Sequence, residues 1–341
     1  MEGMKGFAVI GTGLWGKLHA RVYAESHRAR LAAVCDADPE RAGQVGREFG
    51  ADAYSDHRDM LARDDIDAVS IVTPDFAHTQ LALDAIAAGK HVLVEKPLAM
   101  SVSECERIID AAKKANVKLM VDFHNRWSPP FHKAKAAIDS GGIGSVRLVY
   151  FRLNDTVFVP TKMLSWAGKT TVEWFVGSHA VDTVRWLVGD EVGYVYAVAP
   201  RKILREQGID TPDFYEAVLE FVNGAVAVVE NCWILPESTP NLIDLKCEVI
   251  GSSGALYLDT SHNRTLEQYS PDAACYPDVL VLPEVFGKQV GFAAESIRHF
   301  VECVVDGADP LATGEDALEV TRVIEAIDES AETGRRVAVK R

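Results

Sequence analysis

The chain has 341 residues, a formal net charge of −15 and a hydrophobic fraction of 48% against 25% charged residues. This length is too great for one ordinary hydrophobic core, so we expect two domains. The negative charge would repel phosphate backbones and anionic lipid, and no basic patch offsets it, so we expect neither nucleic-acid nor membrane partners. No stretch approaches the roughly 18 apolar residues of a membrane span, and a cytoplasmic location is the default expectation.

The cysteines also agree with a location in a reducing compartment. The six cysteines lack the paired spacing of zinc or redox motifs, so we predict reduced thiols and no metal site; they are Cys35, Cys105, Cys232, Cys247, Cys275 and Cys303. Scattered cysteines in a long chain also argue against a secreted disulfide scaffold.

The N-terminal third alternates short apolar runs with amphipathic segments, the pattern of a parallel sheet covered by helices. The predicted strands are Phe7–Ile10, Arg30–Asp36, Ala53–Tyr54, Ala68–Thr73, His91–Val94 and Lys118–Asp122. The predicted helices are Trp15–Ser26, Pro39–Phe49, His78–Ala88 and Val102–Ala115, the last opened by a Ser101/Glu104 capping box. Repeated right-handed β–α–β units over residues 1–123 therefore predict an α/β domain.

Beyond residue 123 strands follow one another and predict a mostly antiparallel sheet. Asn223-Gly224 marks a hairpin between Tyr215–Val222 and Ala225–Ile234, because both turn positions tolerate positive φ. A second turn, Gly251-Ser252-Ser253-Gly254, joins Leu242–Ile250 to Ala255–Asp259. Helices predicted at Val172–Leu187, Gly291–Val305 and Gly314–Thr333 would cover one face, so residues 124–341 predict an α+β domain with an open-faced sheet.

A glycine-rich segment between the first predicted strand and helix has the G-x-G-x-x-G pattern; it comprises Gly11, Thr12, Gly13, Leu14, Trp15 and Gly16. The three glycines allow a tight turn, approach of a pyrophosphate to the backbone, and close helix–strand packing. Asp36 ends the second strand, where a carboxylate accepts hydrogen bonds from the adenosine ribose hydroxyls and repels a 2′-phosphate. Strand, helix and spacing together predict a Rossmann domain that prefers NAD to NADP.

Two further motifs follow parallel strands at the sheet edge where ligands bind. Thr73-Pro74-Asp75 with His78 is consistent with a cofactor contact, or with a plain turn and helix cap. Glu95-Lys96-Pro97 places a lysine where it can polarise a substrate oxygen, since proline holds the preceding chain extended. The alternative for Lys96 is a solvated surface charge.

These motifs together resemble the Gfo/Idh/MocA oxidoreductase family. The resemblance spans nearly the whole chain and rests on Gly11–Gly16, Thr73-Pro74 with His78, Ala88-Gly89-Lys90-His91-Val92, Glu95-Lys96-Pro97, Asn125-Arg126-Trp127, Gly141–Val146 and Gly177-Ser178-His179 with Asp182 and Arg185-Trp186. It implies hydride transfer between a nicotinamide and a carbinol or carbonyl carbon of a sugar or polyol. It further implies that Lys96 and His179 face the substrate at the nicotinamide.

On this reading His179 takes the hydroxyl proton while Lys96 stabilises the developing alkoxide, and reduction reverses these steps. Asp182 lies three residues after His179 on the same helix face, where it could fix the imidazole tautomer. Without the resemblance, His179 would more often be a packed or capping residue.

One position departs from the family pattern. Many members have aspartate two residues before the glycine of the G-x-H segment, and this chain has Phe175. The exchange indicates a different substrate class, a sugar ring against apolar walls, or loss of activity. Arg126 and Asn154 are further candidate substrate contacts from segments expected at the interdomain cleft, although Arg126 would equally suit a structural ion pair.

Three functions therefore remain open from the sequence. The first is an NAD-dependent sugar or polyol dehydrogenase, the second a reductase of a sugar or amino-sugar carbonyl, and the third a dinucleotide-binding sensor without turnover. Retained Lys96 and His179 argue against the sensor, since it needs no acid–base groups. The apolar strands between Tyr215 and Ile234 also suggest a homodimer or homotetramer formed through the second sheet.

Overall fold

The computed structural model describes residues 4–261, 265–271 and 274–341. Their contacts group the chain into two units. The first unit extends to His124 and includes Leu280–Leu318, and the second comprises Asn125–Val279 and Glu319–Arg341. Within the described ranges, no helix combines the length and apolar character needed to cross a bilayer.

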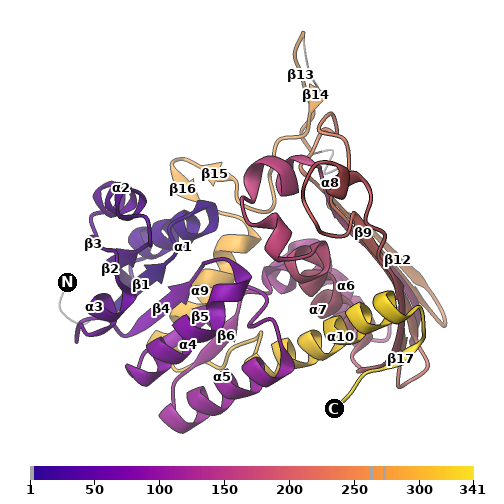
Figure 1. The fold of residues 1–341 in the computed structure, drawn as a ribbon, viewed down its shortest axis with the longest axis horizontal. Coiled ribbons are helices and arrows are strands. Elements are labelled where there is room, and N and C mark those ends of the chain that lie inside the picture. Colours follow the sequence, from indigo (N-terminus) through magenta and orange to yellow (C-terminus); the bar gives the residue numbers. More distant parts are fainter. Residues whose placement is uncertain (1–3, 262–264, 272–273) are drawn as a thin grey trace. The chain divides into compact units, whose positions relative to one another are not determined.

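The first unit is built on a six-stranded parallel sheet with the order β3-β2-β1-β4-β5-β6 (Figure 1). Its strands are β1 (Lys5–Ile10), β2 (Ala29–Cys35), β3 (Asp52–Tyr54), β4 (Ala68–Ile71), β5 (His91–Val94) and β6 (Leu119–Val121). All six predicted strands are confirmed. The central strands were readable because a strand buried on both faces has a continuous apolar sequence, whereas β3 is short and exposed. The order reverses between β1 and β4, and a ligand of such a sheet binds at the carboxyl ends beside this reversal.

The predicted helices of the first unit are also confirmed, as α1 (Leu14–Glu25), α2 (Pro39–Phe49), α4 (His78–Ala87) and α5 (Val102–Ala115). The Ser101 hydroxyl accepts the Glu104 N–H at 3.3 Å, as a capping residue should. Two short elements were not predicted, α3 (His57–Leu61) and the 3₁₀ turn Asp75–Ala77, since one turn of helix carries no readable periodicity. Contacts pair α1 with α2 and α4 with α5.

The helix predicted at Gly291–Val305 forms as α9 (Phe292–Val305), but its expected place over the second sheet is wrong. It packs on α1 in the first unit. Its Phe300 ring also contacts the ring of Phe7 in β1 edge to face, with the ring centroids 6.0 Å apart. The hairpin β15 (Glu284–Val285) and β16 (Lys288–Gln289) precedes it. Residues 280–318 therefore belong to the first unit, although a continuous second domain was expected over residues 124–341. An apolar helix face predicts that the helix is buried, but it does not identify the surface on which the helix packs.

The second unit contains a seven-stranded sheet with the order β12-β11-β7-β10-β9-β8-β17. Its strands are β7 (Val146–Asp155), β8 (Val192–Val198), β9 (Phe214–Phe221), β10 (Val226–Cys232), β11 (Ile243–Gly251), β12 (Ala255–Asp259) and β17 (Val337–Ala338). Only β7 and β10 pair in parallel, so the predicted mostly antiparallel sheet is confirmed. The β9–β10 hairpin turns at Gly224, whose φ of +83° requires glycine.

Helices lie against one face of this sheet, and α7 contacts β7 and β10. The unit's helices are α6 (Pro129–Asp139), α7 (Ser178–Val188), α8 (Ile203–Glu206) and the part of α10 (Gly314–Thr333) from Glu319 onward. The predicted helix Val172–Leu187 is interrupted, since Glu173–Gly177 forms a π-helical turn before α7. The remaining elements are β13 (Gln268–Tyr269), β14 (Ala274–Cys275) and short turns at His124–Trp127, Val159–Met163 and Ala167–Lys169.

Candidate cofactor and substrate site

The glycine turn after β1 has the geometry that a bound pyrophosphate needs. Gly11 has φ +91°, and a Cβ there would lie 2.2 Å from the Val72 carbonyl oxygen. A Cβ on Gly16 would lie 1.7 Å from the Gly11 carbonyl oxygen, so strand and helix pack too closely for any side chain. Gly13 faces open space and gives α1 no side-chain cap, which leaves first-turn N–H groups for an anion.

Asp36 lies directly after β2, and its carboxylate accepts hydrogen bonds from neighbouring residues. Its Oδ2 accepts the N–H and hydroxyl of Thr12 at 2.7 and 3.0 Å, and its Oδ1 accepts the Asp38 N–H at 3.0 Å. Arg41 donates to both oxygens at 3.0 and 2.8 Å. Burial alone would raise the pKa of Asp36, but these donors outweigh it and lower the pKa. Arg41 was not predicted, and its place in the first turn of α2 is the signal that could have revealed it.

His78 joins the two motifs that follow β4 and β5. Its Nδ1 lies 2.7 Å from the Pro97 carbonyl oxygen, and its Nε2 lies 2.9 Å from the Thr73 carbonyl oxygen. The predicted cofactor residue thus ties two loops together. The Thr73 hydroxyl is buried and has no hydrogen-bond partner within the described part of the chain, which fits a group that a cofactor would satisfy. Asp75 accepts the N–H of Phe76 at 2.8 Å.

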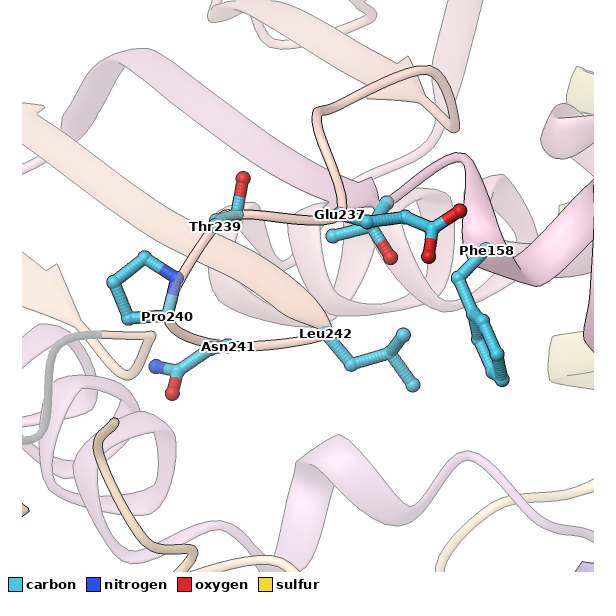
Figure 2. Close-up of a pocket in the computed structure, with 7 residues that line it drawn as sticks. Phe158, Glu237, Thr239, Pro240, Asn241 and Leu242 are labelled. Carbon is cyan, nitrogen blue, oxygen red and sulfur yellow. The ribbon is translucent and has the colours of Figure 1, made fainter. Parts of the chain in front are cut away.

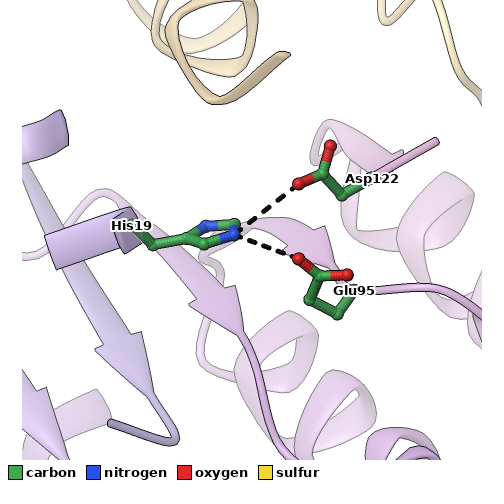
Figure 3. A group of neighbouring side chains, drawn as sticks. All are labelled: His19, Glu95 and Asp122. Atoms are coloured by element: carbon green, nitrogen blue, oxygen red, sulfur yellow. Dashed lines mark hydrogen bonds and ion pairs between the residues drawn. The ribbon is translucent and has the colours of Figure 1, made fainter. Parts of the chain in front are cut away.

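Lys96 follows β5 and is half-buried, preceding the cis peptide bond to Pro97. Its N–H donates to Glu95 Oε2 at 3.3 Å. Glu95 is buried against His19, whose Nε2 lies 3.3 Å from Glu95 Oε1 and 3.6 Å from Asp122 Oδ2 (Figure 3). Sequence reasoning missed His19 and Asp122, although a polar residue on the buried face of the first helix is a readable signal.

An aromatic pair lies beside these residues in the first unit. Trp15, of the glycine turn, stacks on His124 with ring centroids 5.2 Å apart and an interplanar angle of 15°. Leu14 of the same turn is exposed. The pKa of His124 is lowered to about 4, mainly by burial; the charge of Glu95 opposes this change and the charge of Lys96 adds to it. His124 is therefore neutral near pH 7.

The second unit carries the remaining predicted residues. His179 is buried in the first turn of α7. Asp182, expected to orient His179, accepts two hydrogen bonds from Arg126 at 2.6 and 3.0 Å and is fully buried. Arg126 thus forms the structural ion pair that the sequence left open as an alternative to substrate contact.

Asn154 and Phe175 are both engaged within the second unit. The Asn154 side chain accepts the Cys232 N–H at 2.8 Å and donates to Glu230, so it fastens β7 to β10. Phe175 lies 6.0 Å from Trp166 and 6.5 Å from Trp233, measured between ring centroids. An aromatic cluster therefore surrounds the position where many family members have aspartate.

An open pocket of about 170 Å³ follows β7 and is lined by Thr156, Phe158, Glu237, Thr239, Pro240, Asn241 and Leu242 (Figure 2). Figure 2 shows Phe158 and the Glu237 carboxylate on the same side of it. The Lys162 ammonium pairs with the Glu237 carboxylate at 2.8 Å. Hydroxyl, amide and carboxylate groups beside an aromatic ring suit a hydroxylated ligand.

Comparison with known proteins identifies the family. Residues 5–123 match the oxidoreductase family with an NAD-binding Rossmann fold, and residues 131–257 match the GFO/IDH/MocA C-terminal domain. The scyllo-inositol 2-dehydrogenase (NAD(+)) of Bacillus subtilis strain 168 is 30% identical over 93% of this chain and 91% of its own length. D-apiose dehydrogenase of Paraburkholderia graminis is 29% identical over 98% of this chain and 89% of its own.

A solved structure agrees with these matches. GenD2 from gentamicin A biosynthesis, in complex with NAD, superposes with a TM-score of 0.85 at 27% identity, covering 99% of this chain and 97% of that one. The fold class, the resemblance and the NAD-binding Rossmann domain predicted from the sequence are thereby confirmed. The chain belongs to the Gfo/Idh/MocA family of oxidoreductases, whose N-terminal domain is an NAD-binding Rossmann fold.

Proposed function

We propose that this protein is an NAD-dependent dehydrogenase that oxidises a ring or chain hydroxyl of a sugar or polyol. The observation that carries the proposal is a set of groups that follow neighbouring strands of one sheet. They are the open glycine turn, the Asp36 carboxylate, Lys96 and the Thr73 hydroxyl, which has no hydrogen-bond partner among the described residues. The names of the dehydrogenase relatives support the substrate class.

The residues of the first unit fit a dinucleotide. The N–H groups after Gly13 would bind the pyrophosphate of the dinucleotide, and Asp36 would bind its adenosine ribose. The Thr73 hydroxyl would hydrogen-bond to another polar group of the same cofactor. When bound, the cofactor supplies the hydride acceptor. His78 holds the Thr73 and Pro97 backbones, so the loop that carries Lys96 moves with the cofactor-binding loop.

Lys96 and His179 handle the proton and the charge in this proposal. His179 takes the hydroxyl proton as hydride leaves the carbinol carbon, and the Lys96 ammonium stabilises the alkoxide that develops. Reduction of a carbonyl reverses these steps, so a biosynthetic reductase uses the same groups. Asp182 supports α7 through Arg126, which holds the helix turn that carries His179.

Phe175 bears on the substrate. Its cluster with Trp166 and Trp233 replaces a hydrogen-bonding carboxylate by apolar surface, which favours a ring with an apolar face over an open polyol. The same replacement is what supports the sensor alternative, and turnover separates the two.

We also propose a homodimer or homotetramer formed through the outer face of the second sheet. Four tyrosines expose 42–73% of their surface there: Tyr150, Tyr194, Tyr196 and Tyr257. Exposed apolar area on a sheet face favours self-association. We place the enzyme in the cytoplasm, which suits its six free cysteines.

The proposal is tested with purified protein, NAD or NADP, and a panel of inositols, aldoses, sugar acids and anhydrosugars. We expect reduction of NAD with at least one of them and a loss of about 10²–10⁴-fold in kcat for Lys96→Ala. Exposed Lys133→Ala is the matched control and should keep the parent rate. Tight NAD binding without turnover in either direction on alcohols or ketones would contradict a catalytic function.

A further inference from the structure

A buried hydrogen-bonded chain extends from α1 to Lys96 within the first unit. The Tyr23 hydroxyl lies 2.5 Å from Ser70 Oγ, which lies 3.1 Å from His19 Nδ1, and His19 Nε2 lies 3.3 Å from Glu95 Oε1. These residues come from α1, β4 and the end of β5, and each is at most 8% exposed. The chain ends beside Lys96, whose N–H donates to the other Glu95 oxygen.

One order of donors satisfies each bond in this chain. Burial raises the pKa of Tyr23, so its phenol keeps the proton and donates to Ser70. The Ser70 hydroxyl then donates to His19 Nδ1, and His19 Nε2–H donates to Glu95. A carboxylate at Glu95 is the acceptor that this order requires.

The two carboxyl groups of the cluster are not equivalent. Burial alone would raise the pKa of Glu95, but the hydrogen bond from His19, together with nearby charge including that of Lys96, outweighs it, and the pKa falls. Burial raises the pKa of Asp122 well above its ordinary value, and the Glu95 charge raises it further. These opposite shifts favour the negative charge on Glu95 and the proton on Asp122.

Lys96 follows Glu95 directly in the chain, and its backbone N–H donates to Glu95 Oε2 at 3.3 Å. The positive charge of Lys96 helps to lower the pKa of Glu95 and of Asp122. The cluster is also next to His124 after β6, which is neutral, and Ser296 on α9. The buried hydrogen-bonded chain therefore ends at the backbone of Lys96.

We propose that Glu95 is a positioning residue for Lys96. Its carboxylate is held through His19, Ser70 and Tyr23 and accepts the Lys96 N–H, so it fixes the backbone of Lys96 and presents a negative charge next to that lysine. The inference rests on the proposed function, in which the Lys96 ammonium stabilises the substrate alkoxide. In this inference His19 and Glu95 do not contact the substrate, and their role is the same whichever substrate is bound.

The test measures the pKa of Lys96 by competitive acetylation with acetic anhydride across pH, read by peptide mass spectrometry against exposed Lys133 as internal reference. Glu95→Gln should lower the pKa of Lys96 by about 1–2 pH units, because an opposite charge has been removed. Asp122→Asn, which mimics the neutral acid, should leave it within about 0.3 pH units of the parent. Asp84→Asn, which breaks another histidine–carboxylate pair at His57, is the matched control.

This readout needs no substrate, so it separates the inference from the proposed function. Where turnover is available, the alkaline limb of kcat/KM should move with the pKa of Lys96 in Glu95→Gln and stay in Asp122→Asn. An unchanged Lys96 in Glu95→Gln, or a shift in Asp122→Asn as large as in Glu95→Gln, would overturn the inference. So would a stoichiometric metal ion in the purified protein, since ligand atoms of His19, Glu95 and Asp122 lie within 4.8 Å of one another.

Discussion

Two buried glutamates, one in each unit, meet opposite electrostatic conditions. Glu95 has the His19 imidazole 3.3 Å away, and its pKa falls despite burial. Glu173, at the start of the π-helical turn before α7, is fully buried, and neither of its oxygens has a hydrogen-bond partner among the described residues. Burial raises the pKa of Glu173 to about 8, and the charge of Asp328 contributes. The partner, more than the depth of burial, decides which carboxyl group is ionised.

The comparison also explains Gly177. A Cβ there would lie 2.6 Å from the Glu173 carboxyl carbon, so glycine leaves the space that the neutral acid fills. The glycine that marks the family's G-x-H segment thus has a packing reason in this chain, two residues before His179.

The largest expected effect comes from removing the partner of Glu95. His19→Leu leaves a buried carboxylate without compensation and should cost about 3–5 kcal/mol of stability in the first unit. The urea midpoint of that unit's unfolding transition measures it. His57→Leu is the control, because its partner Asp84 is 22% exposed and the loss there should stay below about 1 kcal/mol.

The second expected effect has the opposite sign and depends on pH. Between the ordinary pKa of a glutamate and about 8, native Glu173 retains a proton that the unfolded chain has released, so stability falls as pH rises. Glu173→Gln removes this loss, and its stability relative to the parent should increase by on the order of 3 kcal/mol from pH 5 to pH 8. Thermal unfolding across pH tests this. Exposed Glu206→Gln should show no such trend, and a flat difference for Glu173→Gln would refute the assignment.

His78 sharpens the comparison as a buried histidine bound to carbonyl oxygens instead of a carboxylate. His78→Ala removes the imidazole that contacts the Thr73 and Pro97 carbonyl oxygens and should cost about 1–3 kcal/mol, with weaker NAD binding because the two loops lose this link. Calorimetric titration with NAD measures the second effect. Unchanged NAD affinity would show that the two loops are held independently of His78.

Asp36 gives the smallest effect, since its partner Arg41 is half-exposed. Asp36→Asn removes the charge that repels a 2′-phosphate while Arg41 remains, so the preference for NAD over NADP should fall by about tenfold, or about 1.4 kcal/mol. The ratio of dissociation constants measures this, and the double variant Asp36→Asn/Arg41→Ala should lose the gain for NADP. An unaltered ratio in Asp36→Asn would place the discrimination elsewhere.

Local patterns allowed the first unit to be predicted well from sequence. Continuous apolar runs and helical periodicity lie within single segments, and the glycine turn carries its own spacing, so β1, α1 and Asp36 could be recognised in order. The placement of α9 could not be predicted, because the apolar face of a helix does not indicate which surface it will cover. The outcome for residues 280–318 depended on a contact with α1, more than 250 residues away.

The site was predicted less completely for the same reason. Lys96 and His78 lie in recognisable motifs, whereas His19 of α1 meets Ser70 of β4 and Asp122 after β6 only when the helix packs on the sheet. Arg126 and Asp182 were each singled out, but their mutual ion pair required the second unit's tertiary packing. Residue type and spacing identify the groups available for chemistry; which group neutralises which is a property of the fold.

The most direct measurement of the central claim is isotope transfer. A polyol substrate found in the panel is deuterated at its carbinol carbon and incubated with NAD, and the reduced cofactor is analysed by mass spectrometry. We predict one deuterium in the nicotinamide product of the parent protein and a rate lower by about 10²–10⁴-fold in Lys96→Ala. Reduced cofactor without deuterium, or an undiminished rate in Lys96→Ala, would contradict hydride transfer assisted by Lys96.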